Sequence, residues 1–86
     1  MKPRTPRTNP FEELHRAVKV AALVMAIEDA ARGSSIAAWE LPGIVDRWDR
    51  QSWESVRVSL GHKKHPSDTT KAAVVAMLVE RARRSA

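Results

Sequence analysis

The stretch AVKVAALVMAI, residues 17–27, contains one charged residue, Lys19, and decides the fold of this chain. On a helix, the apolar residues of this stretch and its flanks fall on two faces. One face carries Leu14, Val18, Ala21, Ala22 and Met25, and the other carries Val20, Leu23, Val24, Ile27, Ala30 and Ala31. A helix with two apolar faces must be covered on most sides, either by the rest of the chain or by a partner chain.

The apolar stretch is too short to be a membrane anchor. It has 11 residues, whereas a helix that spans a bilayer needs about 20. At the N-terminus, Lys2, Arg4 and Arg7 are followed by Phe11-Glu12-Glu13 instead of the apolar segment of a signal peptide. We therefore expect a core helix, no membrane partner and a cytoplasmic protein.

Local signals define both ends of this first helix. Asn9 is a candidate N-cap, Pro10 suits the first helical position, and Glu12 completes an Asn-x-x-Glu capping box. Gly33 can adopt a positive φ and end the helix. The sequence therefore predicts a long helix over residues 10–32.

The middle of the chain contains short helical segments. Ser34 or Ser35 can cap a helix over 36–41, which Pro42-Gly43 would break. Pro42 can then open a second helix over 43–48. Each of these segments is only one or two turns long.

A further segment runs over residues 53–60, with Ser52 as its cap and Gly61 at its end. On a helix, Trp53, Val56 and Leu60 share one face. The alternation of apolar and polar residues over 56–60 also fits a short strand. We favour the helix because the chain offers no convincing second strand.

The last helix is predicted over about 68–84. Ser67 or Asp68 can cap it, and it ends in basic residues that suit the negative end of the helix dipole. Its apolar residues are Val74, Val75, Met77, Leu78, Val79 and Ala82. The fold class that follows is all-α, a compact bundle of four to five helices. Residues 1–8 are expected to form a disordered basic arm, and residues 9–86 a single helical domain.

The positive charge is concentrated at the two ends of the chain. The formal net charge is +5, of which residues 1–10 carry +3, residues 57–86 carry +5 and residues 11–56 carry −3. Clustered Lys and Arg favour a polyanionic partner such as nucleic acid.

Metal binding and catalysis find little support in the sequence. His62 and His65 are separated by two lysines, which repel cations, and the chain has no cysteine. No nucleophile motif or Gly-rich phosphate loop is present. We expect no enzyme, no cofactor, no metal and no small-molecule substrate.

The leading hypothesis is a small basic DNA-binding or transcription-regulatory protein that contacts phosphates. The expected contacts are Lys2, Arg4, Arg7, Arg57, Lys63, Lys64, Lys71, Arg83 and Arg84. A helix-turn-helix over 44–48 and 53–60 has an acceptable turn length. However, Glu54 would face the phosphates, and no small residue falls where the two helices must pack closely.

The alternative hypothesis is a protein-protein interaction module, a small helical adaptor or inhibitor of the death-fold or phage type. Its surface would be the tryptophan-rich acidic middle, because Trp and Arg are favoured at interfaces. The residues concerned are Trp39, Arg47, Trp48, Arg50 and Trp53. The competing interpretation places at least two of the three tryptophans in the core. A homodimer through excess apolar surface on either long helix is a further expectation.

Overall fold

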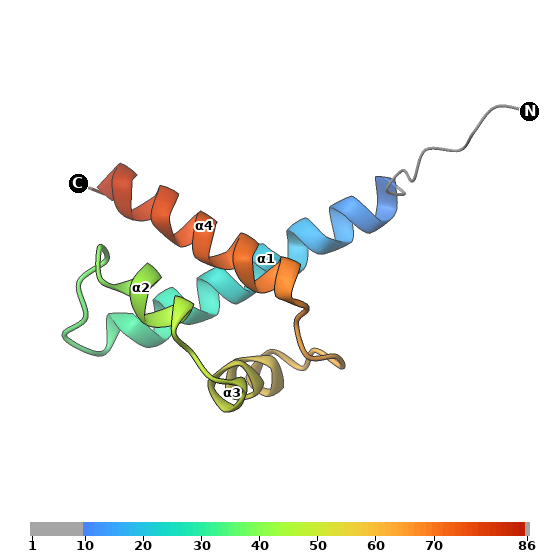
Figure 1. The fold of residues 1–86 in the computed structure, drawn as a ribbon, viewed down its shortest axis with the longest axis horizontal. Helices are drawn as coiled ribbons and strands as arrows, with labels where there is room; N and C mark the ends of the chain where they lie inside the picture. The colour runs from blue at the N-terminus through green and yellow to red at the C-terminus, as the bar shows by residue number, and fades with distance from the viewer. Residues whose placement is uncertain (1–9, 86) are drawn as a thin grey trace, which may run out of the picture.

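The computed structural model describes residues 10–85, and these residues form four α-helices and no strand (Figure 1). The helices are α1 (Pro10–Arg32), α2 (Leu41–Asp46), α3 (Arg50–Leu60) and α4 (Asp68–Ser85). The all-α class and the bounds of the long first helix are confirmed. The proposed basic arm over 1–8 and the Asn9 cap lie outside the described residues.

The two long helices cross, and the two shorter helices pack against them (Figure 1). α2 packs against α4, and α3 packs against α1. The N-terminal half of α1 extends beyond the crossing, away from the rest of the molecule (Figure 1). None of the described helices is long and apolar enough to span a membrane.

The core is built from one face of α1 and from residues of all three other helices. Its buried apolar side chains are Val20, Leu23, Val24, Ile27, Leu41, Val45, Trp53, Val74 and Leu78. The α1 residues of this set form what we call the inner face of α1. The second apolar face predicted for α1 is only partly covered by the described chain, since Leu14, Val18 and Met25 are exposed and Ala21 and Ala22 are half-buried.

The end of α1 differs from the prediction for Gly33. Gly61 is the glycine with a positive φ among the described residues, and Gly33 is not left-handed. The chain instead leaves α1 in a tight turn, in which the Ser34 N–H donates to the Ala31 carbonyl at 3.0 Å. The Ser34 hydroxyl donates to the same carbonyl at 2.8 Å. These two bonds satisfy a terminal carbonyl without a left-handed residue.

The predicted helix over 36–41 is wrong, because residues 36–40 are not helical. The predicted second helix is present as α2, which spans Leu41–Asp46 and contains Pro42 in its first turn. A proline there sacrifices no hydrogen bond, since the first N–H groups of a helix lack partners inside it. The preceding residues form a turn in which Glu40 Oε1 accepts from the Ala37 N–H at 3.1 Å.

The prediction that residues 53–60 are helical is confirmed, but the helix begins earlier than expected. Asp49 is the N-cap of α3 and accepts from the Ser52 N–H at 2.9 Å, so Ser52 lies inside the helix and does not cap it. Gly61 ends α3 with a φ of 73°. As predicted, the inward face holds Trp53, which is buried, and Val56 and Leu60, which pack against the core.

The start of α4 follows the expected capping chemistry. The Ser67 hydroxyl accepts from the Thr70 N–H at 3.2 Å and donates to the Thr70 hydroxyl at 3.1 Å. The buried line of α4 is Val74 and Leu78, whereas Met77 and Val79 of the predicted apolar stripe are exposed.

Candidate nucleic-acid interface

Residues 61–67 connect α3 to α4, and side chains of α3 hold this connection in place. Arg57 donates from Nη1 to the His62 carbonyl at 2.6 Å. Arg57 Nη2 lies 2.8 Å from Glu54 Oε1, and the other oxygen of Glu54 pairs with His65 Nδ1. We call Glu54, Arg57 and His65 the Glu54 cluster. The three-residue spacing of Glu54 and Arg57 is a sequence signal for part of it, but nothing local indicates His65.

Within the Glu54 cluster, the negative charge of the Glu54 carboxylate is balanced by its partners. Hydrogen bonds from Arg57 and His65 lower the pKa of the Glu54 carboxyl from 4.5 to about 2. The same carboxylate raises the pKa of the Arg57 guanidinium. The unfavourable Glu54 charge anticipated near a phosphate is therefore compensated by its neighbours. Arg57 also holds the connection in place through its bond to the His62 carbonyl.

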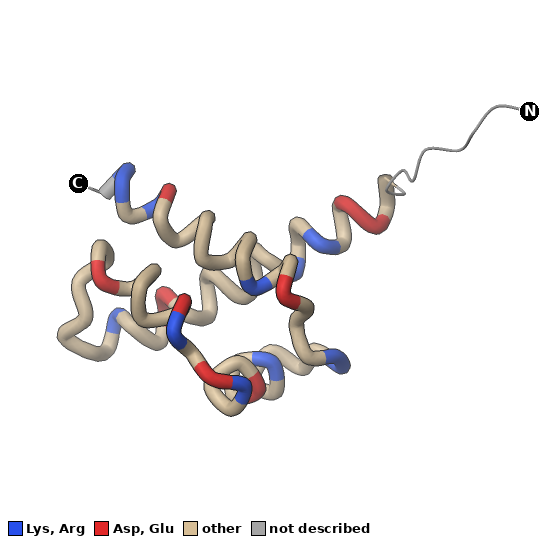
Figure 2. The backbone as a smooth tube through the Cα atoms, in the orientation of Figure 1, with Lys and Arg blue, Asp and Glu red and all other residues tan. Residues whose placement is uncertain are grey.

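Lys63 and Lys64 are exposed on this connection, and neither has a carboxylate within ion-pairing distance. In Figure 2 the connection carries positive charge at its outermost point. Lys71 follows in the first turn of α4, with its Nζ 5.8 Å from the centroid of the Trp53 ring. This cation–π contact fixes Lys71 beside α3. The structure thus brings three of the predicted phosphate contacts to one end of the bundle.

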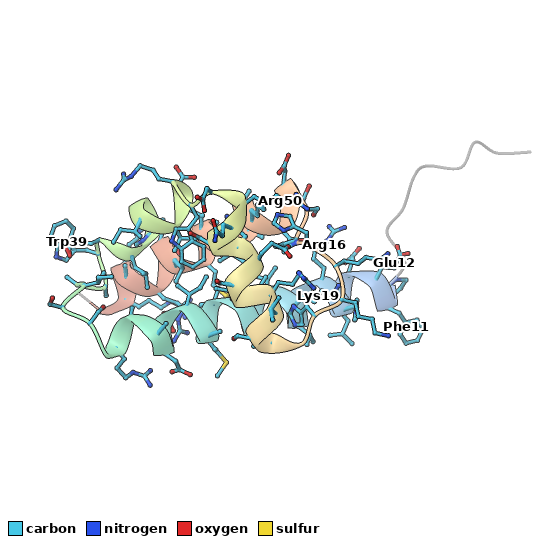
Figure 3. All side chains as sticks on the ribbon, turned by 90° about the horizontal axis from the view of Figure 1, so that it is seen from below. Phe11, Glu12, Arg16, Lys19, Trp39 and Arg50 are labelled. Atoms are coloured by element: carbon cyan, nitrogen blue, oxygen red, sulfur yellow. The ribbon has the colours of Figure 1, made fainter. Side chains whose placement is uncertain are left out.

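Further cations at this end were missed by the sequence reasoning. Figure 3 shows Arg16, Lys19 and Arg50 on the half of the molecule that carries the connection. Arg16 and Lys19 line a hollow of about 800 Å³ that Thr70 of α4 also lines. None of these three cations is ion-paired with a described carboxylate. Arg16 and Lys19 lie in α1 and Arg50 lies at the start of α3, so no local pattern in the sequence indicates that they group with the connection.

The remaining basic residues of α4 lie at its other end. Arg83 and Arg84 are 3.9 Å and 4.0 Å from the carboxylate of Glu80. Arg83 follows Lys71 by twelve positions in the helix, which is about 18 Å along the axis. The structure therefore does not group Arg83 and Arg84 with Lys63 and Lys64. The predicted contacts Lys2, Arg4 and Arg7 lie outside the described residues.

The helix-turn-helix comparison can now be made on the structure. α2 and α3 are separated by residues 47–49, within the length of such a turn. Their main packing partners differ, however, since α2 lies against α4 and α3 against α1. The outward side of α3 presents the exposed residues Arg50, Gln51, Ser55, Val58 and Ser59.

The three tryptophans have different environments. Trp53 is 3% exposed and belongs to the core. Trp48 is half-buried and meets Trp53 edge to face at a centroid distance of 5.1 Å. Trp39 is 75% exposed and lies at the opposite end of the molecule from Phe11 (Figure 3). Of the tryptophans predicted for the core, Trp53 is part of it and Trp48 is partly buried and packs against it. Among the proposed partner contacts, Arg47 and Arg50 are exposed.

An apolar groove of about 410 Å³ lies between the end of α1, α2 and α3. Its lining includes Ile36, Leu41, Ile44, Trp48 and Val56. Trp48 therefore reaches this groove, whereas the Trp39 ring is not part of its lining.

Within residues 10–85, no group of three or more histidine or acidic side chains is arranged to hold a metal ion. His65 pairs with Glu54 through Nδ1, and its Nε2 is buried without a hydrogen-bond partner. His65 thus belongs to the structural cluster that holds the connection.

Comparison with protein-family models, curated proteins and solved structures finds no match for this chain. No role can therefore be transferred to its residues from a relative. The function has to be inferred from the charges and surfaces described above.

Proposed function

We propose that this chain is a non-enzymatic DNA-binding protein that contacts phosphates at the end of the bundle formed by the 61–67 connection. The observation that carries the proposal is the grouping of cations without carboxylate partners around this connection. The group consists of Arg16, Lys19, Arg50, Lys63, Lys64 and Lys71.

Side-chain cations supply the proposed contacts, because the N-terminus of α4 is poorly suited to bind an anion. Asp68 occupies the first turn of α4, and Ser67 already caps it. A negative charge at a helix N-terminus opposes a second anion there, although it stabilises the helix itself. The phosphates would therefore meet Lys63 and Lys64 first, with the polar outward side of α3 nearby.

Fluorescence anisotropy with a labelled random-sequence duplex tests the proposal. Each phosphate contact releases counterions, so about six contacts should weaken binding roughly 10³-fold between 50 and 200 mM salt. Absence of binding at 50 mM salt would refute the proposal.

A pair of charge-matched variants tests the location. Lys63→Glu with Lys64→Glu and Arg83→Glu with Arg84→Glu change the net charge equally, but at opposite ends of α4. We expect the first variant to abolish binding and the second to retain most of it, with the helical circular dichroism signal unchanged in both. Equal losses would show that total charge, and not the 61–67 connection, determines binding.

The second candidate function is protein-protein interaction, and one observation favours it. Ile36 is exposed and lines an apolar groove, and exposed large apolar side chains often mark partner surfaces. Selection of displayed helical peptides against the protein tests it. Peptides that bind the wild type but not a variant with Ile36→Glu and Ile44→Glu would support the groove, and unchanged binding would exclude it.

A further inference from the structure

The outward side of α3 is uncharged along its centre. Trp53 and Leu60 turn toward the core. At 3.6 residues per turn, positions 51, 55 and 58 lie within about 60° of one another and opposite position 60. Gln51, Ser55 and Val58 occupy these positions, and all three are exposed. The centre of this side therefore offers an amide, a hydroxyl and one apolar group to a partner.

Cations stand at both ends of this centre line. Arg50 begins α3, and Lys63 and Lys64 follow its end on the 61–67 connection. No carboxylate in residues 10–85 forms an ion pair with any of the three. The ten helical steps from Arg50 to Leu60 span about 15 Å, and the major groove of B-DNA is about 12 Å wide. Cations at this separation can reach phosphates on both sides of the groove.

The acidic residues of α3 and of its cap are engaged in bonds within the protein. The two oxygens of Glu54 bind Arg57 and His65. Asp49 accepts from the Ser52 N–H at the start of the helix. Neither carboxylate belongs to the centre line, so the middle of the outward side carries no charge that would repel a duplex.

The position of α3 leaves its outward side accessible. α3 lies at the edge of the molecule farthest from α4 (Figure 1), and it is in front of the other helices when the molecule is seen from below (Figure 3). A helix enters a major groove only when one side is free along its length. Within the described chain, the outward side of α3 meets this condition.

We propose that the outward side of α3 enters the major groove of duplex DNA and reads base edges, an inference that rests on the proposed DNA binding. The amide of Gln51 can bond to N6 and N7 of one adenine, and Val58 can contact the methyl group of a thymine. Ser55 can bond to any of several base edges. Lys63 and Lys64 supply phosphate contacts that position the helix. The preferred site should therefore contain an adenine that is recognised by Gln51.

Selection from a pool of random-sequence duplexes, followed by sequencing, tests the reading of bases. We expect the wild type to enrich a short motif that contains A·T pairs. Gln51→Arg should replace one adenine of this motif by guanine, because Arg bonds to O6 and N7 of guanine. Met25→Arg is the charge-matched control at an exposed position of α1, and it should select the wild-type motif.

Fluorescence anisotropy then compares the selected duplex with a scrambled duplex of the same composition. Gln51→Ala should lower the affinity for the selected duplex roughly tenfold or more, since it removes a two-bond base contact. It should leave the affinity for the scrambled duplex and its salt dependence unchanged. Far-UV circular dichroism checks that each variant is folded.

The outcomes separate this inference from the proposed function. Salt-dependent binding to the random pool without enrichment of any motif would overturn the inference and leave the phosphate-contacting function intact. An enriched motif that neither substitution of Gln51 alters would also overturn it. Absence of binding to every duplex would refute the proposed function together with the inference.

Discussion

The connection after α1, residues 33–40, and the connection after α3, residues 61–67, are similar in length but are held differently. In the first, the side-chain hydrogen bonds are local, from Ser34 to Ala31 and from Ala37 to Glu40. In the second, the Glu54 cluster joins the connection to α3 through charged groups. Charged side chains on the preceding helix therefore fix the position of the second connection, whereas the side-chain hydrogen bonds of the first connection join residues only two or three positions apart.

This difference has a consequence for function. The second connection carries Lys63 and Lys64 in a position set by α3, as a phosphate-binding surface requires. The first connection exposes Trp39. Within the described part of the chain, no charged side chain of a neighbouring helix bonds to this connection in the way that Arg57 and Glu54 bond to the second one. Matched substitutions in or beside the two connections test whether they differ in their contribution to stability.

We expect the largest effect from Glu54→Ala, compared with Glu40→Ala. The first substitution removes the acceptor of Arg57 and His65, which are both partly buried, and the second removes one exposed hydrogen bond. Urea unfolding followed by far-UV circular dichroism should show a clear fall in the midpoint for Glu54→Ala and little change for Glu40→Ala. Equal urea midpoints for the two variants would contradict the conclusion that the second connection is held more firmly than the first.

The pH dependence of stability sharpens the same comparison. The pKa of Glu54 is about 2 in the folded protein, against an ordinary value of 4.5 for this carboxyl group. Folding therefore favours the ionised carboxylate. The stabilisation is complete above pH 4.5 and is lost as the pH falls toward 2. Asp49 contributes in the same direction, because its bonds to Ser52 also lower its pKa. Thermal unfolding at pH 6 and pH 2.5 should show a smaller loss of Tm for Glu54→Ala than for the wild type.

The next largest effect concerns Gly33, which follows α1, and Gly61, which follows α3. Gly61 has a φ of 73°, a conformation that costs an L-residue about 1–2 kcal/mol. Gly61→Ala should therefore lower the free energy of unfolding by about that amount. Gly33 has no positive φ and open space around its Cβ position, so Gly33→Ala should stay within about 0.5 kcal/mol of the wild type. A comparable loss in both variants would contradict this assignment of backbone geometry.

The smallest expected effects come from the two serines. Ser67 caps α4 through the Thr70 N–H, and loss of such a cap typically costs about 1 kcal/mol. The bonds of Ser34 are exposed and local, so Ser34→Ala should change the stability by less than about 0.5 kcal/mol. Chemical unfolding of both variants measures the difference. If Ser34→Ala were the more damaging substitution, the first connection would be more firmly held than we infer.

The candidate interface was only partly predictable from the sequence. Lys63, Lys64 and Lys71 are close in the chain, so their proximity follows from local structure. The engagement of Arg57 with the His62 carbonyl depends on the left-handed turn at Gly61. The grouping of Arg16 and Lys19 with the start of α4 requires two helices that are far apart in sequence to cross, and no local pattern encodes such a contact.

The sequence by itself determined the helical class, the bounds of α1, the end of α3 at Gly61 and the cap of α4 at Ser67. These features depend on periodicity, capping groups and glycine geometry, which act over a few residues. Local signals failed over residues 36–40, where a capping serine predicts a helix that does not form, whereas Pro42 does lie in the first turn of a helix. Only the tertiary structure decided which face of α1 is buried, since both faces are apolar. It also decided that His65 meets Glu54, and that Lys63 and Arg83 lie at opposite ends, because such distances depend on how whole helices pack.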